Sequence, residues 1–537
     1  MTIEHVVVLC LENRSFDHML GFLAHPDPSF DGLRGGGFDN PGWDGGPRVP
    51  ASSDAKPVLP FGPDHSHDAV MGQLAGTGAG GAEGPPNQGF VTSYERTGRG
   101  LAPPGRGGLL GAFVDRLRGK PSAPVVADGR GPLVMRCQSP GQVPVLSRLA
   151  LEFAVCDRWF CSVPGETWPN RNYLHAATSD GETDIEIRPY TNRTIFELLE
   201  AHGARWRIYH DDTPQVWAFP RLWDTPERHG NWFPFSRFAT HVAAGDLASY
   251  SFIEPNHRPA LHTLDHTAGL GGSPDVSNSQ HPENNLVSDA GYDGFDAGTD
   301  TDFARGEGLI AQVYEALRAN RRLFATTMLL ITYDEHGGLY DHVAPPSGVP
   351  APGGGSGLLG RLADALWHRR AHRFDFTMLG PRVPAVIVSP LIEPGTVIHQ
   401  VHDHASVPAT LRHLFAPQAA PLTRRDAWSA PFHQSATRDT PRTDLPDLSS
   451  HLRARSAAPS GPAPATSSGE PSPVLAGGGH VPAYYVDFIK QADRVRKRLR
   501  RVGEPEARTI PTRAGIQAAV QTSDAFTQAA HRHRHQS

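Results

Sequence analysis

The distribution of hydrophobic positions along the chain predicts buried strands that alternate with amphipathic helices. Short apolar runs, typical of strands buried on both faces, occupy residues 3–11, 326–332 and 383–388. Hydrophobic positions at helical spacing occupy residues 143–154 and 306–318. Pro384 puts the third run at a sheet edge or at the start of a strand, because proline cannot donate a backbone hydrogen bond. The alternation predicts an α/β fold, a three-layer α/β/α sandwich with a mostly parallel central sheet.

The pattern changes near residue 450, and we expect residues 1–450 to form one main domain. Residues 451–480 are rich in Ala, Pro, Ser and Gly, which is typical of a linker. Residues 481–537 are expected to form a small extension with a basic helix over 487–502. That helix either packs on the main domain or contacts anionic lipid. An amphipathic segment over 357–372 has the same two interpretations, as a surface helix or as a lid that faces a membrane.

Composition and charge exclude several classes of protein. The chain has 537 residues, of which 38% are hydrophobic and 20% charged, which is enough for a large core. With 50 basic and 56 acidic residues its net charge is −6, so we expect no nucleic-acid partner. The four cysteines include no Cys-x-x-Cys pair, and no apolar run approaches the ~18 residues of a membrane span. No basic leader precedes the first strand, which favours a cytoplasmic location for the chain as written.

Polar side chains directly follow two of the predicted strands. Glu12 and Asn13 come after the first, and Asp334 and Glu335 come after the second. Because the carboxyl ends of parallel strands open at the same edge of a sheet, we expect three carboxylates and an amide to meet there. Such charges repel one another, and a hard cation with oxygen ligands, such as Mg, Ca or Mn, removes the conflict. The alternative is that Asp334 and Glu335 are ordinary loop charges.

A further segment, from Ser162 to Arg171, supplies a hydroxyl group. Thr167 is a candidate nucleophile if a base or a metal lowers the pKa of its hydroxyl, and the planar guanidinium of Arg171 suits a phosphate. The alternative is a turn closed by Thr167 and Asn170. Histidines in loops beside Asp, Asn and Pro are candidate acids or phosphate ligands. They are His65, His67, His210, His281, His402 and His404.

Six motifs in order resemble those of the bacterial phosphoesterase family, which holds phosphatidylcholine-type phospholipases C and acid phosphatases. They are LENRSFDHMLG (11–21), PDHSH (63–67), GETWPNR (165–171), EPN (254–256), NSQHP (278–282) and ITYDEHGGLYDHV (331–343). The resemblance covers residues 3–415. It departs from the family pattern at Gly62, where an aspartate is usual, and family members are commonly exported, whereas no export signal is visible here.

The resemblance implies an alkaline-phosphatase-like core and a hydrolase of phosphoric esters. It implies one divalent metal ion of unknown identity, and the residues that correspond to its ligands are Glu12, Asn13, Thr167, Asp334 and Glu335. Thr167 would attack phosphorus and form a covalent phosphothreonine intermediate, which water then hydrolyses. His65, His281 and His210 correspond to the family's histidines near the phosphate.

The leading hypothesis is therefore a metal-dependent phosphoesterase of the phospholipase C type that cleaves a phospholipid or a related phosphodiester. The alternative is a phosphomonoesterase, like the family's acid phosphatases. Its substrate has a substituent on one phosphate oxygen, whereas the substrate of a phosphodiesterase has substituents on two. A protein of another class, which uses the same fold only for binding, is the third possibility. The expected partners are a phosphate-ester substrate and, through peripheral contact, a membrane surface. The sequence leaves the oligomeric state open.

Overall fold

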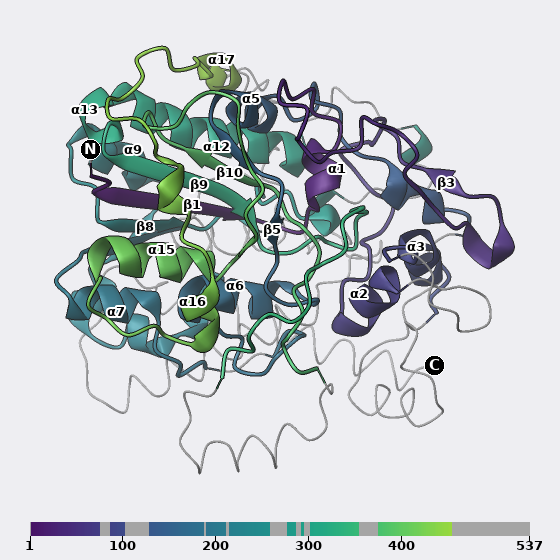
Figure 1. Cartoon of the computed structure of the whole chain (residues 1–537), viewed down its shortest axis with the longest axis horizontal. Helices are drawn as coiled ribbons and strands as arrows, with labels where there is room; N and C mark the ends of the chain where they lie inside the picture. Colours follow the sequence, from purple (N-terminus) through teal and green to yellow (C-terminus); the bar gives the residue numbers. More distant parts are fainter. Residues whose placement is uncertain are drawn as a thin grey trace, which may run out of the picture.

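Two layers of helices enclose a central β-sheet (Figure 1). The computed structural model describes residues 2–75, 86–101, 128–186, 189–210, 214–257, 277–285, 292–294, 301–353 and 374–453. Within these residues the main sheet has eight strands, in the spatial order β11 (Thr396–Ile398), β4 (Ala154–Cys156), β10 (Ala385–Val388), β9 (Thr327–Tyr333), β1 (His5–Leu11), β8 (Tyr250–Ile253), β6 (Trp206–His210) and β7 (Trp232–Pro234). The predicted three-layer α/β/α sandwich is confirmed.

The sheet is mostly parallel, and its centre is the strand β1. β1 pairs in parallel with β8 on one side and with β9 on the other, and β6 pairs in parallel with β8 and β7. β4 and β11 are also parallel, whereas β10 runs antiparallel to both of its neighbours, β9 and β4. The three predicted strands are β1, β9 and β10. Pro384 directly precedes β10, which lies inside the sheet, so the strand start is the correct one of its two expected positions.

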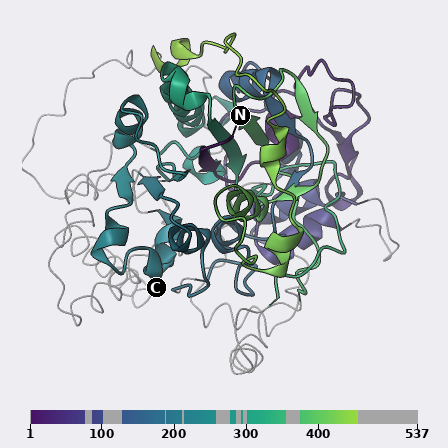
Figure 2. The same cartoon turned by 60° about the vertical axis from the view of Figure 1, so that its left-hand side comes forward.

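Helices cover both faces of the sheet (Figure 1). One layer contains α5 (Pro144–Glu152), α9 (Ser236–Ala243), α12 (Asp302–Ala319) and α13 (Arg321–Phe324), with α17 (Ser449–Arg453) beside α12. The other contains α6 (Thr167–Ala176), α7 (Ile195–Ala201), α15 (Ser406–Phe415) and α16 (Arg424–Trp428). When the view is turned by 60°, β1, in purple at the N-terminus, still lies within the middle layer (Figure 2). The predicted helices over 143–154 and 306–318 correspond to α5 and α12.

Shorter elements complete the described part of the chain. The further α-helices are α1 (Phe16–Leu20), α2 (His67–Leu74), α3 (Phe90–Gly98) and α8 (Pro226–His229). Two pairs of short strands are β2 (Asp39–Asn40) with β3 (Val49–Pro50), and β5 (Trp159–Phe160) with β12 (His402–Asp403). The 3-10 helices are η1 (Trp43–Gly45), η2 (Gly131–Met135), η3 (Gln215–Ala218), η4 (Pro220–Leu222), η5 (Pro282–Asn285) and η7 (Phe432–Ser435).

The core explains why the central strands read as continuous apolar runs. β1 is completely buried from Val6 to Leu11, and every residue of β9 is buried, because helices cover both faces of the sheet. α12 begins where Thr301 accepts a hydrogen bond from the backbone N–H of Ala304 (3.2 Å), an N-cap that starts the helix before the predicted position 306.

Several expectations concern segments beyond the described residues. The amphipathic segment 357–372, the linker 451–480 apart from its first residues, and the extension 481–537 all lie there. The domain boundary at residue 450 therefore stays a prediction, and so does the cytoplasmic location. Among the helices that the structure describes, none combines the length and the hydropathy that a membrane span requires.

Candidate active site

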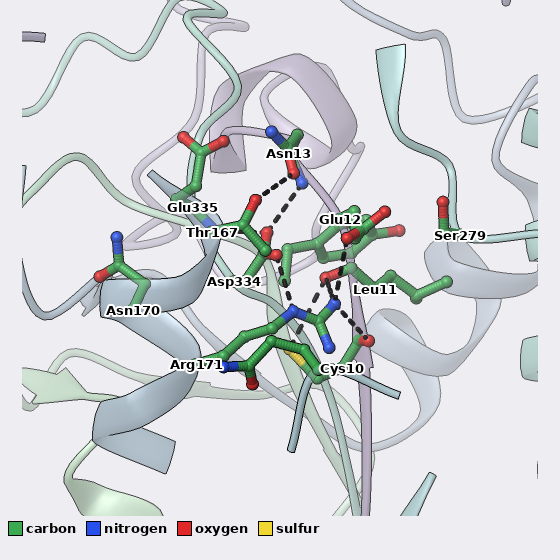
Figure 3. A network of polar contacts seen from close by, with 12 residues as sticks. Cys10, Leu11, Glu12, Asn13, Thr167, Asn170, Arg171, Ser279, Asp334 and Glu335 are labelled. Carbon is green, nitrogen blue, oxygen red and sulfur yellow. Dashed lines mark hydrogen bonds and ion pairs between the residues drawn. The ribbon is translucent and has the colours of Figure 1, made fainter. Parts of the chain in front are cut away.

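The residues that follow β1 and β9 meet at one edge of the sheet (Figure 3). The backbone N–H of Asn13 donates to Asp334 Oδ1 (2.9 Å), and the N–H of Asp334 donates to the carbonyl of Leu11 (3.1 Å). Asn13 has a left-handed backbone, with φ of 56°. Gly337, with φ of 66°, packs so closely that an added Cβ would lie 2.2 Å from the Asn13 carbonyl oxygen. These contacts hold the ends of β1 and β9 close to each other.

Thr167 begins α6 and brings its hydroxyl to this edge. Its Oγ1 donates to Asn13 Oδ1 (3.3 Å; Figure 3). Only 7% of the surface of Thr167 is exposed. Asn170 fixes the loop before the helix, since its side chain bonds both the N–H (3.0 Å) and the carbonyl (3.1 Å) of Val163. Gly165 has no space for a side chain, because a Cβ there would lie 1.9 Å from the Thr183 carbonyl oxygen. The hydroxyl is therefore held by a rigid turn.

The carboxylates at this edge form a set of oxygen donors. Burial raises the pKa of Glu12 to about 7, although His257 and Arg171 act in the opposite direction. Glu335 is fully buried, and its Oε2 accepts the N–H of Gly337 (2.7 Å). Its Oε1 is buried and has no hydrogen-bond partner among the residues that the structure describes. A buried oxygen without a donor, within an all-oxygen set, fits the hard divalent cation that the resemblance implies.

Arg171 lies on the far side of Asp334 from Asn13, beneath the site (Figure 3). Its Nε donates to Asp334 Oδ2 and its Nη1 to Glu254 Oε1, both at 2.9 Å. Its Nη2 donates to the carbonyls of Cys10 (3.3 Å) and Leu11 (3.4 Å). The sequence suggested that this guanidinium binds phosphate, but the structure directs its donors to carboxylates and carbonyls at the ends of β1, β8 and β9. Because its side chain is completely buried, Arg171 fixes the position of Asp334 instead.

Two of the three predicted histidines lie at the site. His65 Nε2 is 3.3 Å from Asn13 Nδ2, and His65 Nδ1 bonds the carbonyl of Pro63 (2.9 Å). Burial disfavours the charged form of His65, but nearby carboxylates, Glu335 first among them, outweigh it and raise its pKa to about 9. The His281 ring lies 5.9 Å from the His65 ring, centroid to centroid.

His210 lies at the same edge of the sheet, on the strand next to the one that ends at Glu254. It ends β6, which β8 separates from β1, and its ring packs edge-on against Trp232 at 5.9 Å. Its role at the phosphate stays a prediction.

The structure adds Glu254 and His257, which the sequence did not single out as site residues, and brings in His404, one of the candidate loop histidines. Glu254 follows β8 and pairs with Arg171, and His257 Nε2 lies 3.6 Å from Glu12 Oε1 and 3.7 Å from Glu254 Oε1. His404 Nε2 donates to the backbone carbonyl of Asp334 (2.5 Å). The strand-end rule that identified Glu12 applies equally to Glu254, but β8 has only four residues and is hard to recognise.

A second group of acidic and imidazole side chains, Asp17, Asp341 and His342, lies near α1. Arg382 donates to Asp341 Oδ1 and to Asp17 Oδ1, both at 2.9 Å, and His342 Nδ1 bonds Asp17 Oδ2 at 2.6 Å. Arg382 thus already supplies the positive charge that a metal would bring. We interpret this group as a buried ion-pair network that ties α1 to the loop before β10.

A hydroxyl on a helix N-terminus beside carboxylates, an amide and two histidines suits a hydrolase that acts on phosphoric esters. Residues 3–416 match the Phosphoesterase family, and the chain belongs to that family. The extent of the match agrees with the motif span 3–415. The expected enzyme class, a phosphoric ester hydrolase, is confirmed.

Similar proteins occur in plants and bacteria. The chain is 33% identical over 464 residues to non-specific phospholipase C3 of Arabidopsis thaliana. The aligned residues cover 83% of this chain and 75% of the relative. It is 28% identical over 461 residues to phospholipase C B of Mycobacterium tuberculosis, covering 79% and 75%. Among solved structures, a protein of the alkaline phosphatase superfamily from Vibrio parahaemolyticus is similar with a TM-score of 0.28 and 11% identity, over 51% of this chain and 60% of that one.

Proposed function

We propose that this enzyme is a metal-dependent phospholipase C that cleaves the phosphodiester of a phospholipid through a covalent phosphothreonine at Thr167. The observation that carries the proposal is the 3.3 Å contact of Thr167 Oγ1 with Asn13 Oδ1, at the edge where Asp334 and Glu335 also lie. The names of the relatives, phospholipases C from a plant and a bacterium, favour the diester over a monoester.

Five residues would hold one divalent ion: Glu12, Asn13, Thr167, Asp334 and Glu335. When bound, such an ion lowers the pKa of a hydroxyl ligand and offsets phosphate charge. The chain itself orients the donors, since Asp334 Oδ1 accepts the N–H groups of Asn13 (2.9 Å) and Glu335 (2.7 Å). The oxygen chemistry of the set and the buried Glu335 Oε1, which has no partner among the described residues, support a hard cation such as Mg, Ca or Mn.

The chain's own residues then carry two displacements at phosphorus. In the first, the Thr167 hydroxyl loses its proton to solvent, Thr167 Oγ1 forms a bond to phosphorus, the bond to the glycerol oxygen breaks, and a histidine gives that oxygen a proton. In the second, a water oxygen forms a bond to phosphorus, the bond to Thr167 Oγ1 breaks, and a proton of that water restores the hydroxyl. The phosphorylated head group then leaves, and the histidine regains a proton from solvent. The side chains of Asn13, His65 and His281 surround the equatorial oxygens and donate hydrogen bonds to the charge that develops there.

The test is paired hydrolysis of p-nitrophenylphosphorylcholine, a diester, and p-nitrophenyl phosphate, a monoester, with and without a chelator. We expect turnover of the diester that is lost in Thr167→Ala and lost on chelation. Thr225→Ala is the matched control, because Thr225 Oγ1 accepts a long hydrogen bond (3.4 Å) from the backbone of α8. Preference for the monoester would make the enzyme a phosphatase. No turnover of either ester, with metals resupplied, would favour a binding protein.

Contact with a membrane surface belongs to the same proposal, because a phospholipase must reach lipid. The two basic segments that could provide it, 357–372 and 487–502, lie outside the described residues. The full chain would be sedimented with vesicles of phosphatidylserine and with vesicles of phosphatidylcholine. Binding to phosphatidylserine vesicles alone would support contact between basic side chains and an anionic membrane surface. Equal binding to both vesicles, or to neither, would contradict it.

A further inference from the structure

Two consecutive buried residues, Asp403 and His404, lie between the loop that leads to Thr167 and the carboxylates of the site. Asp403 ends the short strand β12, which pairs in parallel with β5, the strand that leads into that loop. Helix α15, which follows His404, packs against α6, the helix that Thr167 begins (Figure 1). Both residues are completely buried, so their polar atoms depend on partners within the protein.

Asp403 holds the loop through Ser162. Its Oδ2 accepts hydrogen bonds from Ser162 Oγ (2.9 Å) and from Arg425 Nη1 (3.1 Å). The same guanidinium nitrogen donates to the carbonyl of Ser162 (3.2 Å). Ser162 Oγ in turn accepts the backbone N–H of His404 (3.1 Å). The hydroxyl and the carbonyl of Ser162 are therefore both fixed by one buried network.

The position of Ser162 is transmitted to the nucleophile. Ser162 precedes Val163, whose backbone N–H and carbonyl both bond the side chain of Asn170 on α6 (3.0 and 3.1 Å). Thr167 lies in the chain between these two bonded residues, so the loop and the first turn of α6 move together. A shift of Ser162 would therefore displace the Thr167 hydroxyl from Asn13 Oδ1.

The ring of His404 holds the other half of the site. Its Nδ1 accepts a hydrogen bond from Trp159 Nε1 (3.4 Å), and its Nε2 donates to the backbone carbonyl of Asp334 (2.5 Å). An indole N–H can only donate and a carbonyl can only accept, so these two partners place the ring proton on Nε2. The ring cannot turn without losing both bonds. It thus fixes the backbone of Asp334, whose carboxylate accepts the N–H of Asn13.

We propose that Asp403 and His404 are positioning residues that set the separation between the Thr167 hydroxyl and the Asp334 carboxylate. Asp403 acts on the loop through Ser162, and His404 acts on the carboxylate through the backbone of Asp334. The inference rests on the proposed function, because it takes Thr167 and Asp334 to act on the same phosphate. A displacement of about 1 Å between reacting groups can cost about 10²-fold in rate, so a rigid spacer between them matters.

Ser162→Ala tests the link from Asp403 to the loop, because it removes the hydroxyl that bonds both Asp403 and His404. We expect the first-turnover release of p-nitrophenol from p-nitrophenylphosphorylcholine, which reports the attack of the nucleophile, to slow by about 10-fold or more. The inhibition constant of inorganic phosphate should stay near wild type, since no group that contacts substrate is changed.

Thr410→Val is the matched control for this substitution. The Thr410 hydroxyl is also completely buried, lies on α15, and accepts the backbone N–H of Phe432 (2.9 Å). Thr410→Val should therefore lose stability while its first-turnover rate stays near wild type. A wild-type rate in Ser162→Ala, or an equal loss of rate in both variants, would overturn the proposal.

Substitutions of His404 test its hold on Asp334 by a measurement other than the reaction. Each variant, freed of metal, would be titrated in a calorimeter with Mg²⁺, Ca²⁺ and Mn²⁺ separately. His404→Ala should bind the ion that wild type prefers about 10- to 100-fold more weakly, because a proposed ligand has lost the donor that fixes its backbone. His404→Gln, which keeps an N–H near the position of Nε2, should recover part of the affinity. Wild-type affinity in His404→Ala, or equal losses in the Ala and Gln variants, would overturn the proposal.

The double variant Ser162→Ala/His404→Gln tests whether the two contacts set one distance. If they do, the second substitution should cost less in the background of the first, so the loss of first-turnover rate should be smaller than the product of the two single losses. A loss equal to the product would mean two independent effects and would overturn the shared role.

Thr167→Ala distinguishes failure of this inference from failure of the proposed function. If Thr167→Ala keeps the wild-type rate, or if wild type binds none of the three ions, the proposed function is wrong. If Thr167→Ala is inactive and Ser162→Ala keeps the wild-type rate, only the role given to Asp403 and His404 is wrong. Melting temperatures of all variants would be compared, and a loss of rate that follows the loss of stability in both Ser162→Ala and Thr410→Val would count against positioning.

Discussion

The substitution Arg171→Lys distinguishes the role that the structure gives this residue from phosphate binding. Arg171 makes two charge-assisted hydrogen bonds, to Asp334 and Glu254, both at 2.9 Å and both completely buried. A lysine supplies one compact charge and cannot reproduce the fork. Each such bond contributes about 1.5–3 kcal/mol, so the loss of one should lower the free energy of unfolding by about 2–3 kcal/mol.

The same substitution should weaken metal binding, because Arg171 fixes a carboxylate of the proposed metal set. Residues that orient metal ligands typically change the affinity by about 10- to 100-fold. We would measure urea unfolding without metal and a calorimetric titration with divalent ions. Arg148→Lys is the matched control, since Arg148 is half exposed and pairs with Glu152 on the surface of α5. Its effect should stay below about 0.5 kcal/mol.

Two results would refute this reasoning. If Arg171→Lys kept wild-type stability and metal affinity, its contacts with Asp334 and Glu254 would not be the ones that matter. If it raised only the KM for substrate and the inhibition constant of inorganic phosphate, with metal affinity unchanged, Arg171 would bind phosphate as the sequence suggested. A fall in stability alone would reduce Arg171 to a structural ion pair.

Three further predictions concern the fold and the metal. Burial opposes protonation of His342, but hydrogen bonds to Asp17 and Asp31 outweigh it and raise the pKa of His342 to about 9. Protonated His342 therefore stabilises the folded state by on the order of 3 kcal/mol. This stabilisation is complete below about pH 6.5 and is lost as the pH rises through 9. Unfolding of His342→Gln and wild type from pH 6 to 10 checks this, and a pH-independent difference would contradict it. Gly337→Ala should abolish activity and lower the free energy of unfolding by over ~2 kcal/mol. Gly348 also has a positive φ but has open space around it, so Gly348→Ala should lower the free energy of unfolding by only about 1 kcal/mol. Equal losses of stability would refute the close contact of Gly337 with Asn13. Restoring metal after chelation should raise the melting temperature, and an unchanged value would argue against a resident ion.

The main strands and helices could be predicted because burial on both sides leaves a continuous apolar run. β1 and β9 are such runs, and the rule that ligands gather at carboxyl strand ends then brings Glu12 and Asp334 together. β4 and β8 were not predicted, since three or four apolar residues resemble many loops. Long buried strands could therefore be predicted from the sequence, and strands of three or four residues could not.

The surroundings of the site residues were hard to predict for the same reason. The carboxylates that pair with Arg171 lie 83 and 163 residues away along the chain, so nothing near Arg171 indicates that its charge is already neutralised. His210 lies two strands away from β1, and its sequence neighbours give no sign of that strand order. Partners that are distant in sequence decide whether a polar residue faces substrate or the protein interior.

The central claim is that Thr167 forms a covalent bond to phosphorus. The most direct measurement is rapid acid quenching of the enzyme during turnover of p-nitrophenylphosphorylcholine, followed by mass spectrometry of the peptide that contains residues 165–171. We predict a phosphorylcholine adduct on Thr167 in wild type and no adduct in Thr167→Ala. Steady turnover with Thr167 unmodified, or an adduct on another side chain, would contradict the account.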